Sequence, residues 1–181
     1  MSETTTPLRP KRQIAIRRAT PEDSDAIVGM MRIVREESDR VLPEVDVFYA
    51  RDFAERTIAH RLTWVAVDDA QIIGCLMCAV VSFSYNPKPA AVENMHFGIL
   101  MDYRKYGVAE QLVARLKEAC IALGLPAKIC VDFGPDKAEL KERFVQRCGF
   151  EWVGSNFVFT PDAPASVVHE QKIRKLLAAA E

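Results

Sequence analysis

A short basic turn at residues 104–109, RKYGVA, carries the residue types that bind an anion. A helix that begins near Gly107 leaves its first backbone amides without partners inside the helix, and the helix dipole makes that end positive. Gly107 has no side chain to keep a ligand away from the backbone, and Ala109 keeps the next inner position small. Arg104 and Lys105 add positive charge beside the amides. Together these features predict a cradle for a pyrophosphate group.

The same turn could instead be a surface turn whose basic side chains are merely solvated, and for an isolated turn this is the simpler interpretation. The residues of the turn leave both interpretations open, and the elements on either side give its setting. Residues 90–100 read as a β-strand that feeds directly into the turn. From Val108 onward, apolar residues recur at helical spacing until Gly124, which predicts a helix that ends there. A strand, an anion-binding turn and a helix therefore follow one another.

The chain before this unit begins with an expected strand at 13–18. A helix should start at Thr20-Pro21 and end near Asp39, with one apolar face made by Ile27, Met30, Met31 and Val34. A second helix is expected from Val47 to His60, and residues 63–83 read as a hairpin around an Asp-Asp-Ala turn. Residues 86–89, NPKP, are expected to break the chain before the next strand.

After the helix that ends at Gly124, the pattern predicts a strand at 127–133, a helix at 134–148 and a last β segment at 150–159. The resulting order predicts a mixed sheet flanked by helices, in the α/β or α+β class. We expect a flexible leader at 1–12, one domain at 13–160 and an accessory C-terminal helix at 161–181.

Composition narrows the range of partners. The chain has 24 basic and 25 acidic residues, so no global positive charge draws it to nucleic acid or to an anionic membrane. The N-terminus lacks an apolar signal region, and we expect a cytoplasmic protein. The five cysteines lie in apolar sequence and read as buried thiols. Cys75 and Cys78 form a CxxC pair without a second cluster at zinc spacing, and on one strand they would point to opposite faces.

The segment Arg104-Lys105-Tyr106-Gly107-Val108-Ala109 resembles the R/QxxGxG/A signature of the GNAT acyltransferases, which binds the pyrophosphate of acyl-CoA. The resemblance extends from about Gln13 to Phe159, and RFVQRCGF at 143–150 is similar to the family's late helix ending in Gly-Phe. Two departures are mild, because Met101 replaces the family's usual proline and Ala109 its last glycine.

The resemblance implies a GNAT fold, a mostly antiparallel sheet whose fourth and fifth strands splay so that the pantetheine arm of acetyl-CoA inserts between them. Backbone groups around Ile99 and Met101 would bond the thioester carbonyl and the arm, an oxyanion-type use of amides. No metal is expected. The cofactor-binding set that this implies is Ile99, Met101, Arg104, Lys105, Tyr106, Gly107, Val108 and Ala109.

Two residues compete as the general base that deprotonates the acceptor amine. Glu93 is the first candidate, because its position resembles that of a glutamate in histone acetyltransferases of this fold. Strand alternation would place it on one face with Met95, Phe97 and Ile99, although it could equally be a surface or salt-bridged carboxylate. His96 is the second candidate. It should face away from Glu93 unless a bulge at Gly98 rotates the strand, and a packed histidine with its hydrogen bonds satisfied is the simpler interpretation.

One departure affects the general acid. Many family members place a tyrosine four residues before the glycine of Gly-Phe to protonate the departing thiolate, and this chain has Val145 there. The asparagine often found earlier on that segment is absent as well. Water could protonate CoA instead, another donor could reach in, or the acid is dispensable because thiolates leave readily. Tyr103 and Tyr106 are donors by residue type, although lining the loop is the simpler role.

The resemblance implies that the first two helices and their connection cover the acceptor site. The region carries acids that could attract a cationic amine, although a solvated charged face is simpler: Glu36, Glu37, Asp39, Glu44 and Asp46. Its aromatic residues Phe48, Tyr49 and Phe53 are expected to pack the helix rather than to form an acceptor wall.

The leading hypothesis is transfer of an acetyl group from acetyl-CoA to a primary amine on a small molecule or peptide. The alternatives are a degenerate GNAT-fold module that binds CoA or a protein partner without catalysis, and acyl transfer to a nucleobase-linked amine. The C-terminal helix and exposed strand edges are compatible with a homodimer.

Overall fold

A five-stranded sheet carries the fold in the computed structural model, which describes residues 13–38, 42–83, 86–131 and 138–151. Its strands lie in sequence order: β1 (Ala15–Arg18), β2 (Thr63–Asp68), β3 (Gln71–Phe83), β4 (Asn86–Ile99) and β5 (Ala127–Lys128). The first four pair antiparallel, and β5 runs parallel to β4. The expected mixed, mostly antiparallel sheet is confirmed.

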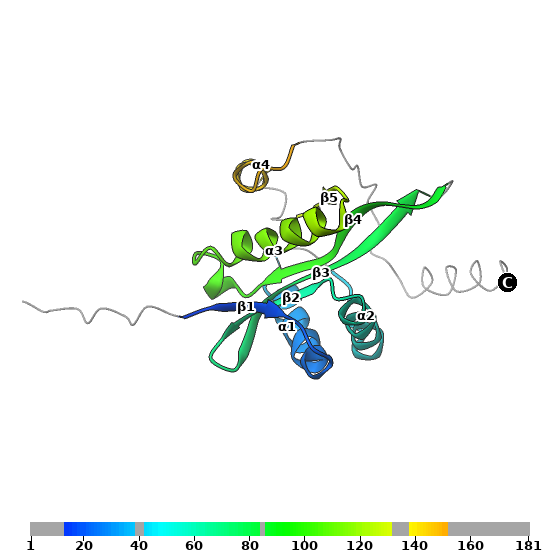
Figure 1. The fold of residues 1–181 in the computed structure, drawn as a ribbon. Coiled ribbons are helices and arrows are strands. Elements are labelled where there is room, and N and C mark those ends of the chain that lie inside the picture. The colour runs from blue at the N-terminus through cyan, green and yellow to red at the C-terminus, as the bar shows by residue number, and fades with distance from the viewer. Residues whose placement is uncertain (1–12, 39–41, 84–85, 132–137, 152–181) are drawn as a thin grey trace, which may run out of the picture. The chain divides into compact units, whose positions relative to one another are not determined.

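Helices lie on both sides of this sheet (Figure 1). Two of them cover one face: α1 (Ser24–Glu36), which follows a short 3₁₀ turn at Pro21–Asp23, and α2 (Val47–Ala59). The opposite side carries α3 (Val108–Leu123) and α4 (Ala138–Arg147). The helix starting at Val108 ends at Gly124 as predicted, because Gly124 adopts a left-handed φ of 65° there.

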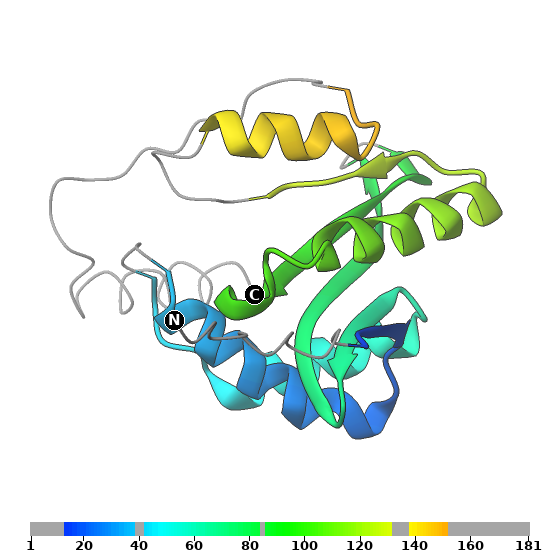
Figure 2. The ribbon, with the colours of Figure 1, turned by 90° about the vertical axis from the view of Figure 1, so that its left-hand side faces the viewer.

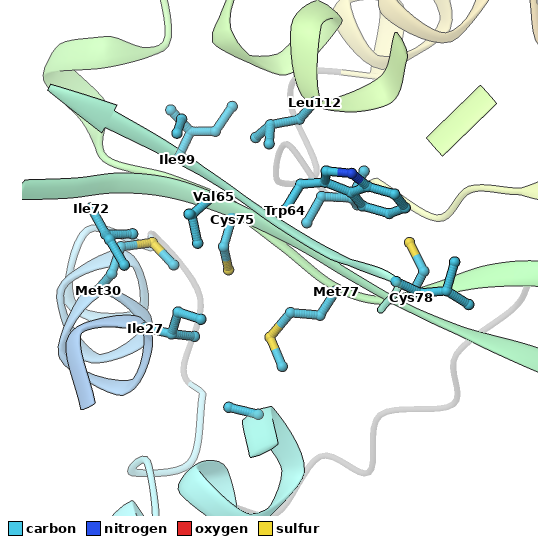
Figure 3. Close-up of a cluster of buried hydrophobic side chains, with 14 of the residues drawn as sticks. Ile27, Met30, Trp64, Val65, Ile72, Cys75, Met77, Cys78, Ile99 and Leu112 are labelled. Carbon is cyan, nitrogen blue, oxygen red and sulfur yellow. The ribbon is translucent and has the colours of Figure 1, made fainter. Parts of the chain in front are cut away.

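The core lies on both faces of β3, the most central strand. Figure 3 shows Met77 on the side of α1, whose Ile27 and Met30 are buried. The opposite side holds Leu112 of α3 with Ile99. The predicted inner face of α1 is confirmed for Ile27, Met30 and Met31, which are less than 9% exposed, while Val34 is half-buried against the same core.

The cysteine prediction is confirmed for only three of the five residues. Cys75 and Cys78 are buried on β3, where burial raises the pKa of both thiols, that of Cys78 to about 12. Cys120 is buried as well, but Cys148 is only partly buried and Cys130 is exposed. Cys130 lies outside the core because the chain leaves the sheet immediately after β5.

The prediction that residues 86–89 break the chain is wrong. β4 begins at Asn86 and runs through this segment, where its pairing with β3 is irregular at Ser82 and Phe83. Irregular pairing at the start of a strand tolerates prolines, since a missing amide there interrupts no regular ladder. β5 is also shorter than expected, with two residues rather than seven. The β segment at 150–159 and the accessory helix at 161–181 lie outside the described residues, except for 150 and 151.

Candidate functional site

The turn between β4 and α3 is held by backbone hydrogen bonds between residues three apart in the sequence. Tyr103 N–H donates to the Leu100 carbonyl at 2.9 Å, Arg104 N–H to Met101 at 3.2 Å, and Tyr106 N–H to Tyr103 at 3.2 Å. Gly107 then adopts a left-handed φ of 70° and serves as the N-cap of α3. Arg104, Lys105 and Tyr106 are exposed, so the turn is open rather than covered by neighbouring side chains.

The N-terminus of α3 offers unpaired amides to an anion. The first N–H to be bonded by the helix backbone is that of Gln111, which donates to the Gly107 carbonyl at 3.2 Å. The amides of Val108, Ala109 and Glu110 precede it, and the geometry of an α-helix gives such amides no partner within the helix. A Cβ added at Gly107 would meet no atom within 4 Å, so a ligand has free access to the backbone. The residues present therefore fit a diphosphate.

Arg104 does not point into this cradle as the sequence predicted. Its Nε donates to the Ile99 carbonyl at 2.9 Å, and its terminal nitrogen pairs with the Glu37 carboxylate at 3.0 Å. Glu37, directly after α1, also accepts from the Met101 N–H at 2.8 and 3.1 Å. One carboxylate thus ties the end of α1 to the end of β4. The carboxylate engages the Met101 N–H and Arg104 engages the Ile99 carbonyl, and both backbone groups were expected to face the pantetheine arm.

The sheet opens between β5 and β4, the strand that leads into the turn. Only two residue pairs join them, Val92 with Ala127 and Glu93 with Lys128. β4 continues to Ile99, and the two strands lie together near one end and separate beyond it (Figure 2). We call the point of separation, residues 93–96 of β4 with 128–130, the fork. Among the described residues, none pairs with β4 on this side beyond the fork.

A bulge at Met95 bends β4 within the fork. Met77 lies opposite His96 and Cys78 opposite Asn94, so Met95 has no partner on β3. The bulge is at Met95 rather than at Gly98, where the sequence analysis considered one. Cross-strand partners share a face, and Ala79 and Met77 are two residues apart on β3. Their partners Glu93 and His96 therefore lie on the same face.

This bulge makes the predicted face of Glu93 wrong. Phe97 and Ile99 pair with Leu76 and Gly74, which lie on the face opposite Ala79, the partner of Glu93. The prediction failed because it assumed uninterrupted alternation, and one extra residue reverses the alternation for everything after it. Phe97 instead packs toward α4, where its ring centroid lies 6.3 Å from that of Phe144.

Glu93 is paired across the last β4–β5 rung, where the fork begins. Lys128 Nζ lies 3.3 Å from both carboxylate oxygens, and the Glu93 side chain is 29% exposed. The alternative that Glu93 is a salt-bridged carboxylate therefore agrees with the structure. Because the Lys128 side chain is 68% exposed, this pair is solvated and weakly held.

His96 is packed, and its Nε2 is closed to solvent and has no hydrogen-bond partner among the described residues. Burial lowers its pKa to about 4, so the imidazole is neutral at pH 7. A Cβ added at Gly98 would lie 2.9 Å from this Nε2, and Val34 of α1 is the next neighbour. Gly98 therefore makes room for the ring. His96 is packed as expected, but the expectation that its hydrogen bonds are satisfied is wrong for Nε2 among the described residues.

Comparison with known proteins identifies the family. The model of the acetyltransferase (GNAT) domain matches residues 59–152, from the end of α2 through α4. The chain belongs to the GNAT acetyltransferase family. The motif on which the sequence analysis rested, residues 104–109, lies inside the matched region. No curated protein matches the chain.

Solved structures share this fold at low sequence identity. A predicted acetyltransferase from Clostridium acetobutylicum, solved with acetyl-CoA, is 16% identical with a TM-score of 0.64, covering 82% of this chain and 96% of that one. The aminoglycoside N-acetyltransferase AAC(6')-Iy in complex with CoA is 17% identical with a TM-score of 0.64, covering 86% and 100%. The aminoglycoside acetyltransferase meta-AAC0020 from an uncultured soil sample, in complex with trehalose, is 14% identical with a TM-score of 0.60, covering 82% and 97%.

Val145, at the position where many GNAT proteins have the general-acid tyrosine, is a packing residue in this chain. Val145 is half-buried in a small cluster with Val113, Val131 and Phe144. Tyr103 donates its hydroxyl to Asp68 at 2.9 Å, so that group is already engaged. Tyr106 is 39% exposed at the turn, and Lys105 Nζ lies 5.4 Å from its ring centroid.

The acceptor-side helices differ from expectation at their aromatic residues. Phe53 is partly buried against the core, but Phe48 and Tyr49 are 87% and 67% exposed, so their predicted packing role is wrong. They fall on the side of α2 opposite the buried Ala50 and Ala54. Among the acids, Asp46 caps α2 by accepting from the Tyr49 N–H at 3.0 Å. Asp39 lies outside the described residues.

Other features of the described residues lie apart from this site. A cavity of about 360 Å³ at the C-terminal end of α3 is lined by residues including Arg18, Leu62 and Leu123, none of them in the turn or the fork. In the described part of the chain, no cluster of His, Cys, Asp or Glu is arranged to hold a metal ion. No described helix is long and apolar enough to cross a membrane.

The sequence did not predict three contacts of this GNAT site: Glu37 was expected only as an acceptor-side acid, and Lys128 and Asn94 were not singled out. Glu37 meets Met101 across 64 residues of sequence, and Lys128 meets Glu93 across 35. The third residue, Asn94, is the one with a local sequence signal, because asparagine is a poor strand former and lies here in the middle of a β-rich run. Its side chain donates to the Cys130 carbonyl at 2.9 Å and accepts from the Cys130 N–H at 2.6 Å.

Proposed function

We propose that the chain transfers an acetyl group from acetyl-CoA to a primary amine on a small molecule or peptide. The observation that carries this proposal is the exposed cradle of amides at the N-terminus of α3 beside the fork between β4 and β5. A diphosphate bound at Gly107, Val108 and Ala109 would lay the pantetheine arm along the bare edge of β4. Lys105 would add charge there, and Tyr106 would line the entrance.

Backbone groups of β4 would position the arm. Leu100 N–H donates to β3, at the Ile73 carbonyl, and successive residues of a strand direct their polar groups to opposite sides. The polar groups of Ile99 therefore face the gap, and so do those of Phe97, two residues earlier. An amide here can hold the thioester oxygen as negative charge develops on it. Of the groups assigned to the arm, the Ile99 N–H bonds no side chain of the described residues. The Ile99 carbonyl already accepts from Arg104, and the Met101 N–H becomes available only when Glu37 releases it.

Glu93 is the proposed general base. Acetyl-CoA supplies the thioester that the amine attacks, and the amine must first lose a proton. The Glu93 carboxylate would take that proton directly or through a water molecule. His96 shares its face and is neutral, so it can also accept a proton, but a pKa of about 4 makes it a weak base. The departing thiolate takes its proton from water, since Val145 cannot donate one.

A charge pair at Gly107 tests the cofactor site. Asn and Asp both tolerate the left-handed backbone that Gly107 adopts, and they are nearly the same size. Gly107→Asp should bind CoA at least about tenfold more weakly than Gly107→Asn, because only Asp places a negative charge against the diphosphate. Isothermal calorimetry measures both affinities. Equal affinities for the two variants would show that the diphosphate binds elsewhere.

Turnover across a panel of amines tests the chemistry. Glu93→Gln should lower kcat by about 10²- to 10⁴-fold while leaving CoA affinity unchanged. Glu118→Gln, an exposed acid of α3 that pairs with Arg115, is the matched control and should keep wild-type turnover. An unchanged kcat for Glu93→Gln would exclude Glu93 as the base.

A second candidate function is a module that binds CoA without catalysis. The packed Val145 favours it, because the usual acid position can no longer donate a proton. This function predicts CoA binding without acyl transfer to any amine of the panel. Measurable turnover with one amine would rule it out.

A further inference from the structure

The side chain of Asn94 occupies a place that belongs to the backbone of a regular sheet. Val92 N–H donates to the Pro126 carbonyl at 2.9 Å, which fixes the parallel register of β4 and β5. Two residues further along a regular parallel ladder, the N–H of Cys130 would donate to the main-chain carbonyl of Asn94. Instead it donates to the Asn94 side-chain Oδ1 at 2.6 Å.

The same side chain also supplies the hydrogen-bond donor for the Cys130 carbonyl. Its Nδ2 donates to the Cys130 carbonyl at 2.9 Å, so one carboxamide satisfies both polar groups of Cys130. A carboxamide carries the same donor and acceptor as a peptide group. The two strands are therefore still joined at this rung, but they are separated by the length of a side chain.

This contact coincides with the Met95 bulge, one residue further along β4. A bulge bends its strand and increases the local twist. The bulge turns β4 away, and Asn94 holds the segment after β5 at a set distance from it. Beyond them the polar groups of Phe97 and Ile99 face a gap with no partner strand among the described residues.

We propose that Asn94 is a positioning residue that sets the width of the slot for the pantetheine arm. The inference rests on the proposed function, since it names the residue that spaces the site assigned there. Without the carboxamide, Cys130 would lose two partners, and the segment after β5 would either close onto β4 or move away from it. Both outcomes misplace the wall of the slot. The cradle at Gly107 belongs to a different element and would be unaffected.

Two ligands separate the slot from the cradle. CoA contains the pantetheine arm, whereas adenosine 3′-phosphate 5′-diphosphate contains only the nucleotide. Asn94→Ala should weaken CoA binding about tenfold, because two hydrogen bonds that hold the slot are lost. It should leave the affinity for the nucleotide within about twofold of wild type, which also reports that the variant is folded. Asn94→Asp keeps the acceptor for the Cys130 N–H but loses the donor, and its loss should be intermediate.

Calorimetry with wild type, the two Asn94 variants and Gln71→Ala measures these affinities. Gln71 is exposed at the first position of β3, so its variant is the control and should match wild type for both ligands. An Asn94→Ala variant with wild-type CoA affinity, or one that loses both ligands equally, would overturn the inference. A wild-type chain that binds no CoA would instead refute the proposed function.

Discussion

His96 is packed in the interior, yet one of its ring nitrogens has no hydrogen-bond partner among the described residues. Its ring fits over Gly98, where any side chain would collide with it, and its Nε2 contacts no polar group of the described residues. Leaving a buried nitrogen without a partner costs about 1–3 kcal/mol, which is a substantial fraction of the stability of a domain. His96 therefore places an unpartnered ring nitrogen within the fork, on the same face as Glu93.

The pH dependence of stability isolates His96. His96 has a pKa of about 6.5 in the unfolded chain and about 4 in the folded protein. Between these pH values the unfolded state therefore binds more protons than the folded state. The free energy of unfolding should therefore fall as the pH drops from 6.5 to 4, with about 3 kcal/mol of the decrease due to His96. Urea titrations at several pH values should show a flatter dependence for His96→Gln. Parallel curves for the two proteins would contradict the burial of the imidazole.

At the scale of elements, α1 and β4 are joined through Glu37. The carboxylate accepts from the Met101 N–H, which exists only because this chain lacks the proline usual at that position. It also partly neutralises Arg104 beside the cradle. The end of the helix that should cover the acceptor is thus connected to the turn that should hold the donor.

Neutralising Glu37 should separate its two effects. Glu37→Gln should lower the free energy of unfolding by about 1 kcal/mol, since the Met101 N–H loses a charged acceptor. It should also tighten CoA binding severalfold, because Arg104 becomes free to attract the phosphates. Urea unfolding and calorimetry measure the two quantities, with the neighbouring exposed Glu36→Gln as the control. Weaker CoA binding in Glu37→Gln would mean that Glu37 orders the turn rather than competing for it.

At the scale of the whole molecule, the sequence was informative where a signal was local. Gly107 before a run of apolar residues at helical spacing predicts the start of α3, and Gly149 before Phe150 predicts the end of α4, where Gly149 has a φ of 76°. The family resemblance added the parted sheet and the donor substrate, and family membership is confirmed. Oligomeric state and the acceptor remain predictions.

The rest depended on contacts between distant segments. The bulge at Met95 arises from the register between β3 and β4, which no pattern within residues 90–100 contains. The face of Glu93 was predicted wrongly for that reason. Likewise, Asn94 gains its role only because the segment after β5 passes beside it, and Phe48 is exposed because neighbouring residues of α2 meet the core instead.

The Met95 bulge has a consequence for solubility. An unpaired strand edge is a template on which a second molecule can add a strand of its own, and such additions propagate into aggregates. A long, straight edge is the most hazardous kind, whereas a bent one fits a foreign strand poorly. By bending β4 at the start of its bare stretch, the bulge would discourage self-association while leaving room for a thin, flexible small molecule.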